Sequence, residues 1–454
     1  MTRELVGAGE VAGDIGCANA DGERSGWASP RQTPVGQAGR ATDFRCHAQP
    51  DAVYCRRFLP IHLHAPLQTR LFISNMLFRR FPLNRINWVT SSFLIGTLVL
   101  TLTAVPPYLW HFGLDWFQVA LFFFMFLATG MSITLGYHRL FSHITFQAGW
   151  PVKLFTLVFG AAAFENSVLM WCSEHRHHHK HVDHDELDPY AISKGFFWAH
   201  IGWLIFKLDS DEPFDNVADL EKDPLVRWQD KYVQWIAVVV SFIFPAALGY
   251  LWNGWAGALG AFLIGGVARV VAVQHSTFFI NSACHYFGNR PYSVKCSARD
   301  SWFMALFTFG EGYHNYHHEF QHDYRNGVKP WQWDPTKWTI WLLSKVGLVR
   351  SLRRVPHEKI LMAQLAETQR QLEARLASAE QHSVTLSESA QAMLQAASDY
   401  LIDLNHRWVE IRRDYAKRTE QTLENSREKL TELREELKIA LAHLKCLRMI
   451  EATA

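Results

Sequence analysis

The chain has 454 residues, among them 23 His, 18 Trp and 31 Phe, and its formal net charge at pH 7 is only +2. A chain this close to neutral gives no electrostatic support for a nucleic-acid partner. The seven Cys are scattered and form no Cys-x-x-Cys pair, which indicates free thiols in a reducing compartment rather than a disulfide framework.

Residues 1–75 come first in chain order and differ from everything that follows. They are rich in Gly, Ala, Ser, Pro, Arg and Asp without a sustained hydrophobic period, so we predict a disordered extension. Residues 1–20 lack the apolar core of a signal peptide. The stretch MLFRRFPLNRINW begins at Met76 and is typical of a natural start: an initiator, basic residues and a membrane-entry Trp.

Three long runs without Asp, Glu, Lys or Arg follow, at 86–114, 116–137 and 232–268. A membrane-spanning helix needs about 20 mainly apolar residues. The first two runs each supply one such helix, and the third is long enough for two with a turn at Asn253-Gly254. We therefore predict four transmembrane helices, at about 90–111, 116–137, 232–252 and 255–279. Pro106 and Pro107 should kink or end the first of them.

The positions of Lys and Arg predict the orientation of these spans. Basic residues precede the first span and are frequent in 138–231 and 280–356, whereas the connections 112–115 and 252–254 carry none. By the positive-inside rule, both termini and both long segments lie on the cytoplasmic side. A shorter apolar stretch, 154–170, contains Glu165 and is expected to be re-entrant or interfacial rather than spanning.

Residues 357–450 form a tail that is rich in Ala, Leu, Glu, Gln and Arg and contains no Gly or Pro. Two sets of apolar residues repeat at heptad spacing: Leu423, Leu430, Leu437 and Leu444, and, three positions after the last three of these, Leu433, Ala440 and Leu447. This is the a/d seam of a coiled coil. One interpretation is a coiled coil that pairs with a partner or builds a homo-oligomer. The other is an amphipathic helix that folds back on residues 357–380.

Clusters of His stand out in the segments between the predicted spans. HRLFSH carries His138 and His143 directly after the second span. Two further clusters each place three His at relative positions 0, 3 and 4, a spacing that puts them on one helical face. These are His175, His178 and His179, and His314, His317 and His318. Imidazole suits iron, zinc and copper, and eight His suit two ions better than one.

Two details of the spacing make separate predictions. His177 falls about 200° from His175 on a helix, so it should not point with the other rings. His138 and His143 are five residues apart and do not share an α-helical face, so we expect the helix to end or distort there.

These boxes, interleaved with four spans, resemble those of the membrane fatty acyl desaturases. GYHRLFSH, WCSEHRHHHKH, GFFWAHIGW, NSACHYFGNRPY and GEGYHNYHHEF are similar to the stearoyl-CoA desaturase branch, close to its bacterial members. The resemblance covers about residues 76–350 and neither terminal region. It implies an all-α integral membrane protein with four transmembrane helices and a cytoplasmic helical domain that holds a His-rich diiron site. The coiled-coil-like tail comes after this domain and is not part of the resemblance.

The resemblance also implies a set of metal ligands, nine His and an Asn that acts through a bridging water. They would be His138, His143, His175, His178, His179, Asn281, His285, His314, His317 and His318. Asn281 and His285 are four residues apart, so one helical turn can present both. Asp188, Glu174 and Glu311 are candidates for carboxylates that orient the rings through their free N–H groups; ordinary surface acids are the alternative for each.

The implied reaction is O2-dependent insertion of a cis double bond, at the Δ9 position, into a saturated acyl chain. The chain contains no haem-binding HPGG and no iron–sulfur spacing of Cys, so the two electrons should come from a separate ferredoxin-like donor and its reductase. The expected location is the inner (cytoplasmic) membrane. A membrane diiron hydroxylase of alkanes or lipids is the alternative enzyme. A His-rich metal transporter would need ionisable groups inside its spans, which are nearly free of them apart from Arg269 and His275.

Two departures from the family leave the form of the substrate open. Animal acyl-CoA members read WARDHR where this chain reads WCSEHR, so Ser173 replaces an Arg. They also carry two basic residues after HVGWLLV, of which only Lys207 is kept. Because such residues would serve the phosphates of CoA, the acyl chain could be attached to CoA, to a lipid or to a carrier protein.

Residues of the second span should set the length of the acyl chain. Phe122 and Met125 are three apart on one helical face, roughly 20–24 Å below His138 at about 1.5 Å per residue. We expect them to line the far end of the acyl channel. The alternative is that both face lipid or a neighbouring helix.

Overall fold

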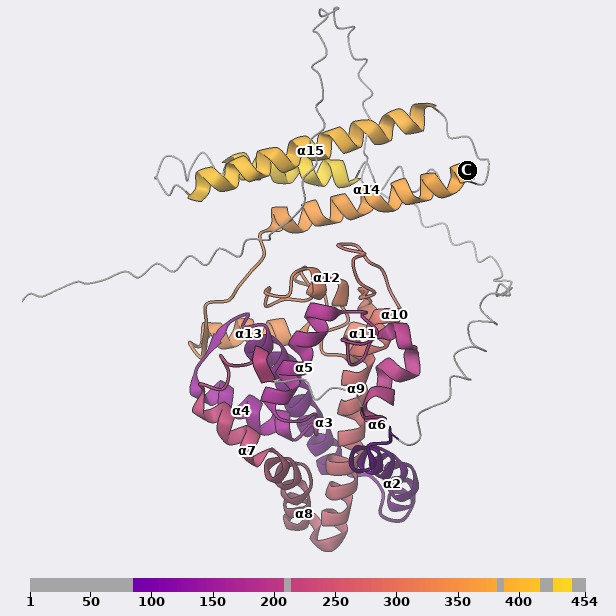
Figure 1. Ribbon diagram of the computed structural model, residues 1–454. Coiled ribbons are helices and arrows are strands. Elements are labelled where there is room, and N and C mark those ends of the chain that lie inside the picture. Colours follow the sequence, from indigo (N-terminus) through magenta and orange to yellow (C-terminus); the bar gives the residue numbers. More distant parts are fainter. Residues whose placement is uncertain (1–84, 208–213, 382–387, 417–427, 443–454) are drawn as a thin grey trace, which may run out of the picture. The chain divides into compact units, whose positions relative to one another are not determined.

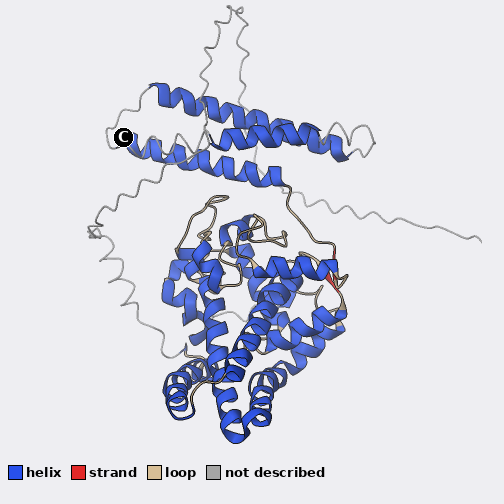
Figure 2. Cartoon of the chain, turned by 180° about the vertical axis from the view of Figure 1, so that it is seen from behind, coloured by secondary structure: helices blue, strands red, loops and turns tan. Residues whose placement is uncertain are grey.

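The computed structural model describes residues 85–207, 214–381, 388–416 and 428–442, which are mostly helical (Figures 1 and 2). Apart from isolated β-bridges, the described residues form one small antiparallel sheet, β1 (Gln147–Ala148) with β2 (Val349–Arg350). Cys172, Cys284 and Cys296 are buried and free, as predicted. The predicted disordered extension and Met76 lie outside the described residues.

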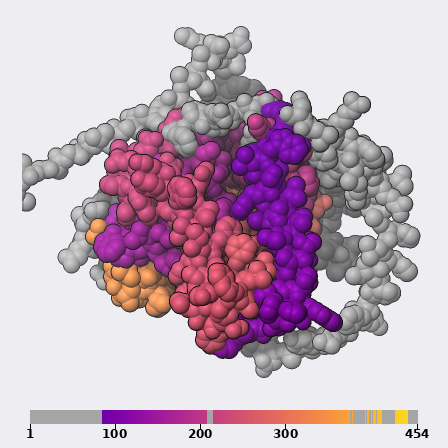
Figure 3. Space-filling model, turned by 90° about the horizontal axis from the view of Figure 1, so that it is seen from below, coloured from indigo at the N-terminus to yellow at the C-terminus, as the bar shows by residue number. Residues whose placement is uncertain are grey.

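Three helices are long and apolar enough to cross a membrane: Trp88–Phe112, Trp116–Ser142 and Pro224–Tyr286. The first is α2 (Trp88–Phe112), which begins after Asn87, whose side chain accepts a hydrogen bond from the Thr90 amide. It continues past Pro106 and Pro107, so these residues do not end it. It packs against the third long helix, as Figure 3 shows (indigo beside pink to red).

The second long helix combines α3 (Trp116–Met131) with the π-helical segment η2 (Ser132–Ser142). It extends five residues beyond the predicted end at residue 137. The apolar run stops there because His138 and Arg139 follow, but both side chains are buried and Arg139 is only 1% exposed. Its charge is paired inside the protein, so the helix can continue through it.

The third long helix is a succession of segments: α7 (Pro224–Val238), η6 (Val239–Ile243), α8 (Phe244–Gly260), η7 (Ala261–Ala268), α9 (Arg269–Asn281) and α10 (Ala283–Tyr286). The backbone leaves the helical region at the predicted turn, with φ −148° at Asn253 and φ 54° at Gly254. The limbs on either side then meet closely, because a Cβ added at Gly249 would lie 2.2 Å from the Gly257 carbonyl oxygen.

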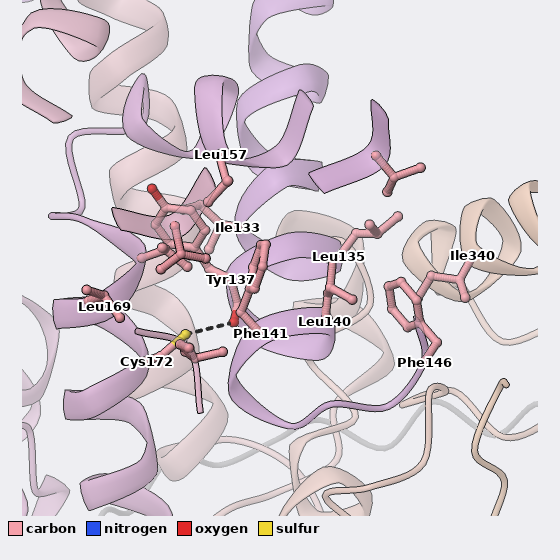
Figure 4. Packing of buried hydrophobic residues seen from close by; sticks show 14 of the residues in the cluster. Ile133, Leu135, Tyr137, Leu140, Phe141, Phe146, Leu157, Leu169, Cys172 and Ile340 are labelled. Carbon is pink, nitrogen blue, oxygen red and sulfur yellow. Dashed lines mark hydrogen bonds between the residues drawn. The ribbon is translucent and has the colours of Figure 1, made fainter. Parts of the chain in front are cut away.

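The stretch expected to be re-entrant or interfacial contains α4 (Trp150–Ala161), a turn with Glu165 and the start of α5 (Val168–His181). With 12 residues, α4 is too short to span a bilayer. Leu157 of α4 packs against Ile133 and Tyr137 of η2 in the main buried cluster (Figure 4). This packing fixes η2 and α5, the two elements that carry the first and second His boxes.

The remaining elements of the central part are short. They are η3 (Ile192–Lys194), η4 (Trp198–Gly202), α6 (Trp203–Ile205), η5 (Phe214–Asn216), α11 (Trp302–Phe307), α12 (His314–Glu319) and α13 (Pro335–Lys345). Of these, α12 carries the third His box. Asp334 caps α13 by accepting a hydrogen bond from the Lys337 amide.

The tail contains α14 (His357–Gln381), α15 (Glu388–Ala416) and helical residues 428–442. Eight buried apolar residues from all three helices form one cluster: Leu361, Leu365, Leu404, Ile411, Leu433, Leu437, Ala440 and Leu441. Three residues of the predicted seam, Leu433, Leu437 and Ala440, therefore pack within the chain. This agrees with the fold-back interpretation; Leu423, Leu444 and Leu447 lie outside the described residues.

Candidate metal centre

Nine imidazoles from four places in the chain converge into two groups. Group one is His138, His143, His175, His179 and His317, and group two is His178, His285, His314 and His318. Within each group, one ligand-capable atom per residue lies within 4.8 Å of the others. All are buried except His179 and His318, which are half-buried.

The π-helix explains how His138 and His143 reach the same group. The amide of His143 donates to the carbonyl of His138 at 3.1 Å, a hydrogen bond between residues five apart. In this wider turn, residues five apart lie above one another, whereas in an α-helix they do not. The predicted distortion is therefore present, and its effect is to bring both rings into group one.

The two boxes with 0, 3, 4 spacing each divide their rings between the groups. His175 and His179 of α5 belong to group one and His178 to group two, while α12 gives His317 to group one and the other two to group two. His177 belongs to neither group. Its ring stacks on His181, and its Nε2 lies 3.8 Å from Asp215 Oδ1.

The Nε2 atoms of the groups face one another at short range. His138 and His317 approach to 2.9 Å, His143 and His175 to 2.9 Å, and His285 and His314 to 3.1 Å. On the opposite side, His178 Nδ1 lies 3.0 Å from Asp188 Oδ1. An ionised carboxylate only accepts hydrogen bonds, so Nδ1 of His178 is the donor, and in a neutral ring this leaves Nε2 with a bare lone pair.

Burial also favours the neutral form of six of the rings. It lowers the pKa of six imidazoles well below the ordinary 6.5, and the neighbouring His lower it further; the six are His143, His175, His179, His314, His317 and His318. Neutral imidazole is the form that binds a metal ion. Inward lone pairs on neutral nitrogens fit a pair of first-row transition-metal ions.

A buried ion network lies behind His138. Glu311 Oε2 is 3.0 Å from His138 Nδ1, while Glu311 Oε1 is 2.8 Å from Arg139 Nη2. Arg139 also pairs with Asp334 at 3.1 Å, and all three charged side chains are at most 1% exposed. Burial alone raises the pKa of Glu311, but Arg139 and His138 lower it below its usual value, so Glu311 is ionised.

Two of the three candidate carboxylates therefore contact imidazoles, Asp188 and Glu311. Burial raises the pKa of Asp188, but His178 beside it brings it below its ordinary value. Glu174 makes no hydrogen bond to any of the nine imidazoles among the described residues, and burial raises its pKa to about 7. Sequence reasoning missed Arg139 and Asp334. A signal for Arg139 was available, because it is a charged residue at the end of an apolar helix and a buried charge needs an oppositely charged partner.

The remaining predicted site residues lie on several elements of the fold. Asn281 is half-buried at the end of α9, one turn before His285, and Lys207 is exposed. Met125 is fully buried with Leu121 and Ala261 of η7. Phe122 packs beside Tyr108 and Leu263 and stacks on Phe126 at 6.0 Å. Both side chains thus contact neighbouring helices in the described part of the chain.

Comparison with known proteins identifies relatives of this arrangement. The family model for fatty acid desaturase matches residues 114–338. Acyl-CoA desaturase 1 of Saccharomyces cerevisiae is 36% identical over 295 residues, which are 63% of this chain and 56% of the relative. The probable acyl-CoA desaturase of Schizosaccharomyces pombe is 41% identical over 248 residues, 54% of this chain and 51% of the relative.

The sn-1 stearoyl-lipid 9-desaturase of Anabaena variabilis is 35% identical over 272 residues, 59% of this chain and 94% of the relative. The chain thus spans about half the length of the two yeast relatives and nearly all of the Anabaena protein. In each case the match leaves part of this chain uncovered.

Proposed function

The chain belongs to the fatty acid desaturase family, and from this premise we propose that it introduces a cis double bond, at Δ9, into a saturated acyl chain. The acyl chain loses two hydrogen atoms, and O2 takes up these together with two electrons and two protons to give two molecules of water. The observation that carries the proposal is the pair of buried imidazole groups, within which Nε2 atoms face one another at 2.9 to 3.1 Å.

The proposed metal centre holds two iron ions. The residues that would hold them are His138, His143, His175, His178, His179, His285, His314, His317 and His318, with Asn281 acting through water. When bound, two iron ions would supply the chemistry that converts O2 into an oxidant strong enough to remove hydrogen from two adjacent, unactivated methylene groups. Neutral imidazoles suit this task because they hold the ions without adding negative charge.

The side chains around the imidazoles orient them. Asp188 accepts a hydrogen bond from Nδ1 of His178. Glu311 lies beside the corresponding nitrogen, Nδ1, of His138. Arg139 neutralises Glu311, so that its carboxylate can remain ionised in a buried position. Such partners fix the tautomer and the direction of each ring before a metal ion binds.

The proposed substrate is a long saturated acyl chain bound to CoA or to a lipid. The two yeast relatives are named acyl-CoA desaturases, and the Anabaena relative is named a stearoyl-lipid 9-desaturase. The names of the relatives therefore include both CoA-bound and lipid-bound acyl substrates. Lys207 would contact the polar end of the substrate. Phe122 and Met125 would line the far end of the acyl channel. Both lie on the same continuous helix as the proposed ligand His138 and come before it in the chain.

The proposed topology has four crossings of the inner (cytoplasmic) membrane with both termini in the cytoplasm. The helical break at Asn253 and Gly254 supports two crossings within the third long helix. Residues 76–350 would form the desaturase domain and 357–450 the tail. The two electrons would come from a ferredoxin-like donor and its reductase.

Expression in a host that makes no unsaturated fatty acids tests the proposal. Fatty-acid methyl esters from the thioester and phospholipid pools are analysed separately, with the His178→Ala chain as the matched inactive control. A Δ9 monoene in cells with the wild-type chain alone is the expected result. An alcohol without an alkene would favour the membrane diiron hydroxylase. Neither product, from inserted and iron-loaded protein supplied with a ferredoxin and its reductase, would refute the proposal.

A further inference from the structure

The loop that follows α5 has an unusual backbone at Asp183. Its φ is 66°, in the left-handed region that few residues other than Gly adopt. The Asp183 amide donates to Asp188 Oδ2 at 2.9 Å, and the other oxygen of the same carboxylate faces His178 Nδ1. The carboxylate that orients one imidazole of group two therefore also holds the backbone of Asp183.

The side chain of Asp183 reaches a segment that is distant in the sequence. Its Oδ2 accepts from the Ser297 amide at 2.6 Å, and its Oδ1 accepts from the Ser297 hydroxyl at 2.5 Å. Ser297 Oγ in turn lies 2.7 Å from Nδ1 of His285, another imidazole of group two. One short loop is thus linked to both His178 and His285.

The single hydroxyl proton of Ser297 decides the direction of the hydrogen bonds. An ionised carboxylate cannot donate, so the hydroxyl proton points to Asp183 and the Ser297 oxygen is left as an acceptor. His285 must then donate from Nδ1, which keeps its Nε2 unprotonated. That Nε2 lies 3.1 Å from His314 Nε2, inside group two.

We propose that Asp183 is a positioning residue of the metal centre: acting through Ser297, it holds His285 in the tautomer whose Nε2 can bind a metal ion. The inference rests on the proposed metal centre and adds a residue pair to it. Without the carboxylate, the Ser297 hydroxyl is free to donate to His285 Nδ1, which moves the ring proton to Nε2 and blocks the metal-binding atom. The same loop also sets the tautomer of His178, because the Asp183 amide holds the Asp188 carboxylate that faces His178 Nδ1.

Anaerobic Fe(II) titration of the purified full chain, with metal content per chain, tests this inference. Asp183→Asn and Ser297→Ala should each weaken the binding of one of the two ions by roughly 10- to 100-fold and leave the other unchanged, because such partners typically contribute that much to metal affinity. Ser297→Thr keeps the hydroxyl and should retain both affinities. Asp185→Asn is the matched control, because Asp185 is exposed in the same loop and bonds only to Ser193 among the described contacts.

The thermal unfolding of the metal-free chains separates positioning from a structural role. Equal melting temperatures for the wild type and Ser297→Ala, together with selective loss of one ion, support the inference. Wild-type affinity for both ions in Asp183→Asn and Ser297→Ala would overturn it, as would loss of both ions together with a lower melting temperature. A wild-type chain that binds two ions and makes no alkene would refute the proposed function and leave this inference intact. A wild-type chain that binds no iron would refute both.

Discussion

Arg139 and Glu311 are 172 residues apart in the chain and form a buried ion pair of 2.8 Å, with both side chains 1% exposed. The pair joins η2, which carries the first His box, to the residue three positions before α12. Because Glu311 also contacts His138, this ion pair connects the stability of the fold to the geometry of group one.

Removing one partner of this ion pair should destabilise the whole protein. Arg139→Ala leaves Glu311 and Asp334 buried without their cation, and we expect a loss of about 3–5 kcal/mol in the free energy of unfolding. Lys153→Ala is the control, since Lys153 pairs with Asp223 at 2.6 Å but is 31% exposed, and about 1 kcal/mol or less is expected there. Denaturation in detergent measures both; a similar small loss for the two variants would contradict the prediction.

The two imidazole groups should both be needed for activity. His317→Ala removes a ring from group one and His178→Ala removes one from group two, so each should abolish desaturation and lower bound iron. His177→Ala should be nearly silent because this ring lies in neither group. Product analysis and iron content per chain are the measurements. Equal loss of activity in all three variants would show that the assignment of rings to the groups is wrong.

The stability of the metal-free protein should fall as the pH is lowered below about 6.5. Burial depresses the pKa of six imidazoles in the folded chain, whereas in the unfolded chain they protonate near 6.5. The unfolded state therefore binds more protons below that pH, and each such group removes up to about 1.4 kcal/mol per pH unit. Melting temperatures between pH 7.5 and 5.5 measure this, and values independent of pH would contradict it.

The length of the acyl product should depend on the second long helix. Phe122→Ala is expected to admit longer substrates than the wild type accepts, and Met125→Trp to favour shorter ones, since Met125 is fully buried and a larger ring must occupy neighbouring space. Leu127→Trp is the control, because Leu127 is 51% exposed on the same helix. Product lengths from mixed saturated substrates are measured; an unchanged profile in both variants would place these residues outside the channel.

The tail should fold within a single chain and should not set the oligomeric state. Leu437 is fully buried among α14, α15 and residues 428–442, so Leu437→Asp should open the tail to limited proteolysis. Ile439→Asp is the control, since Ile439 is 56% exposed on the same helix. Light scattering in detergent should give one oligomeric state for the wild type and both variants. Dissociation of an oligomer by Leu437→Asp would restore the coiled-coil interpretation.

Local features of the protein could be read from the sequence. The charge-free runs predicted the first long helix to within two residues at its start, and the turn at Asn253-Gly254 lies where it was predicted. The 0, 3, 4 spacing placed three rings on one side of α5 and kept His177 away from them. Such features depend on helical periodicity and on the cost of burying charge, and both act between residues that are close in the chain.

Contacts between distant segments were decided by tertiary structure alone. The sequence could not show that the rings of one box divide between two groups, nor that Arg139, placed after an apolar run, is neutralised by Glu311 and Asp334. It also gave no sign that Asp183 meets Ser297, 114 residues away. The heptad pattern of the tail allowed either pairing with a partner or folding back on the same chain. An apolar seam must be buried, but its sequence does not say which helix buries it. Only the packing of helices brought together from different parts of the chain determines which groups become neighbours.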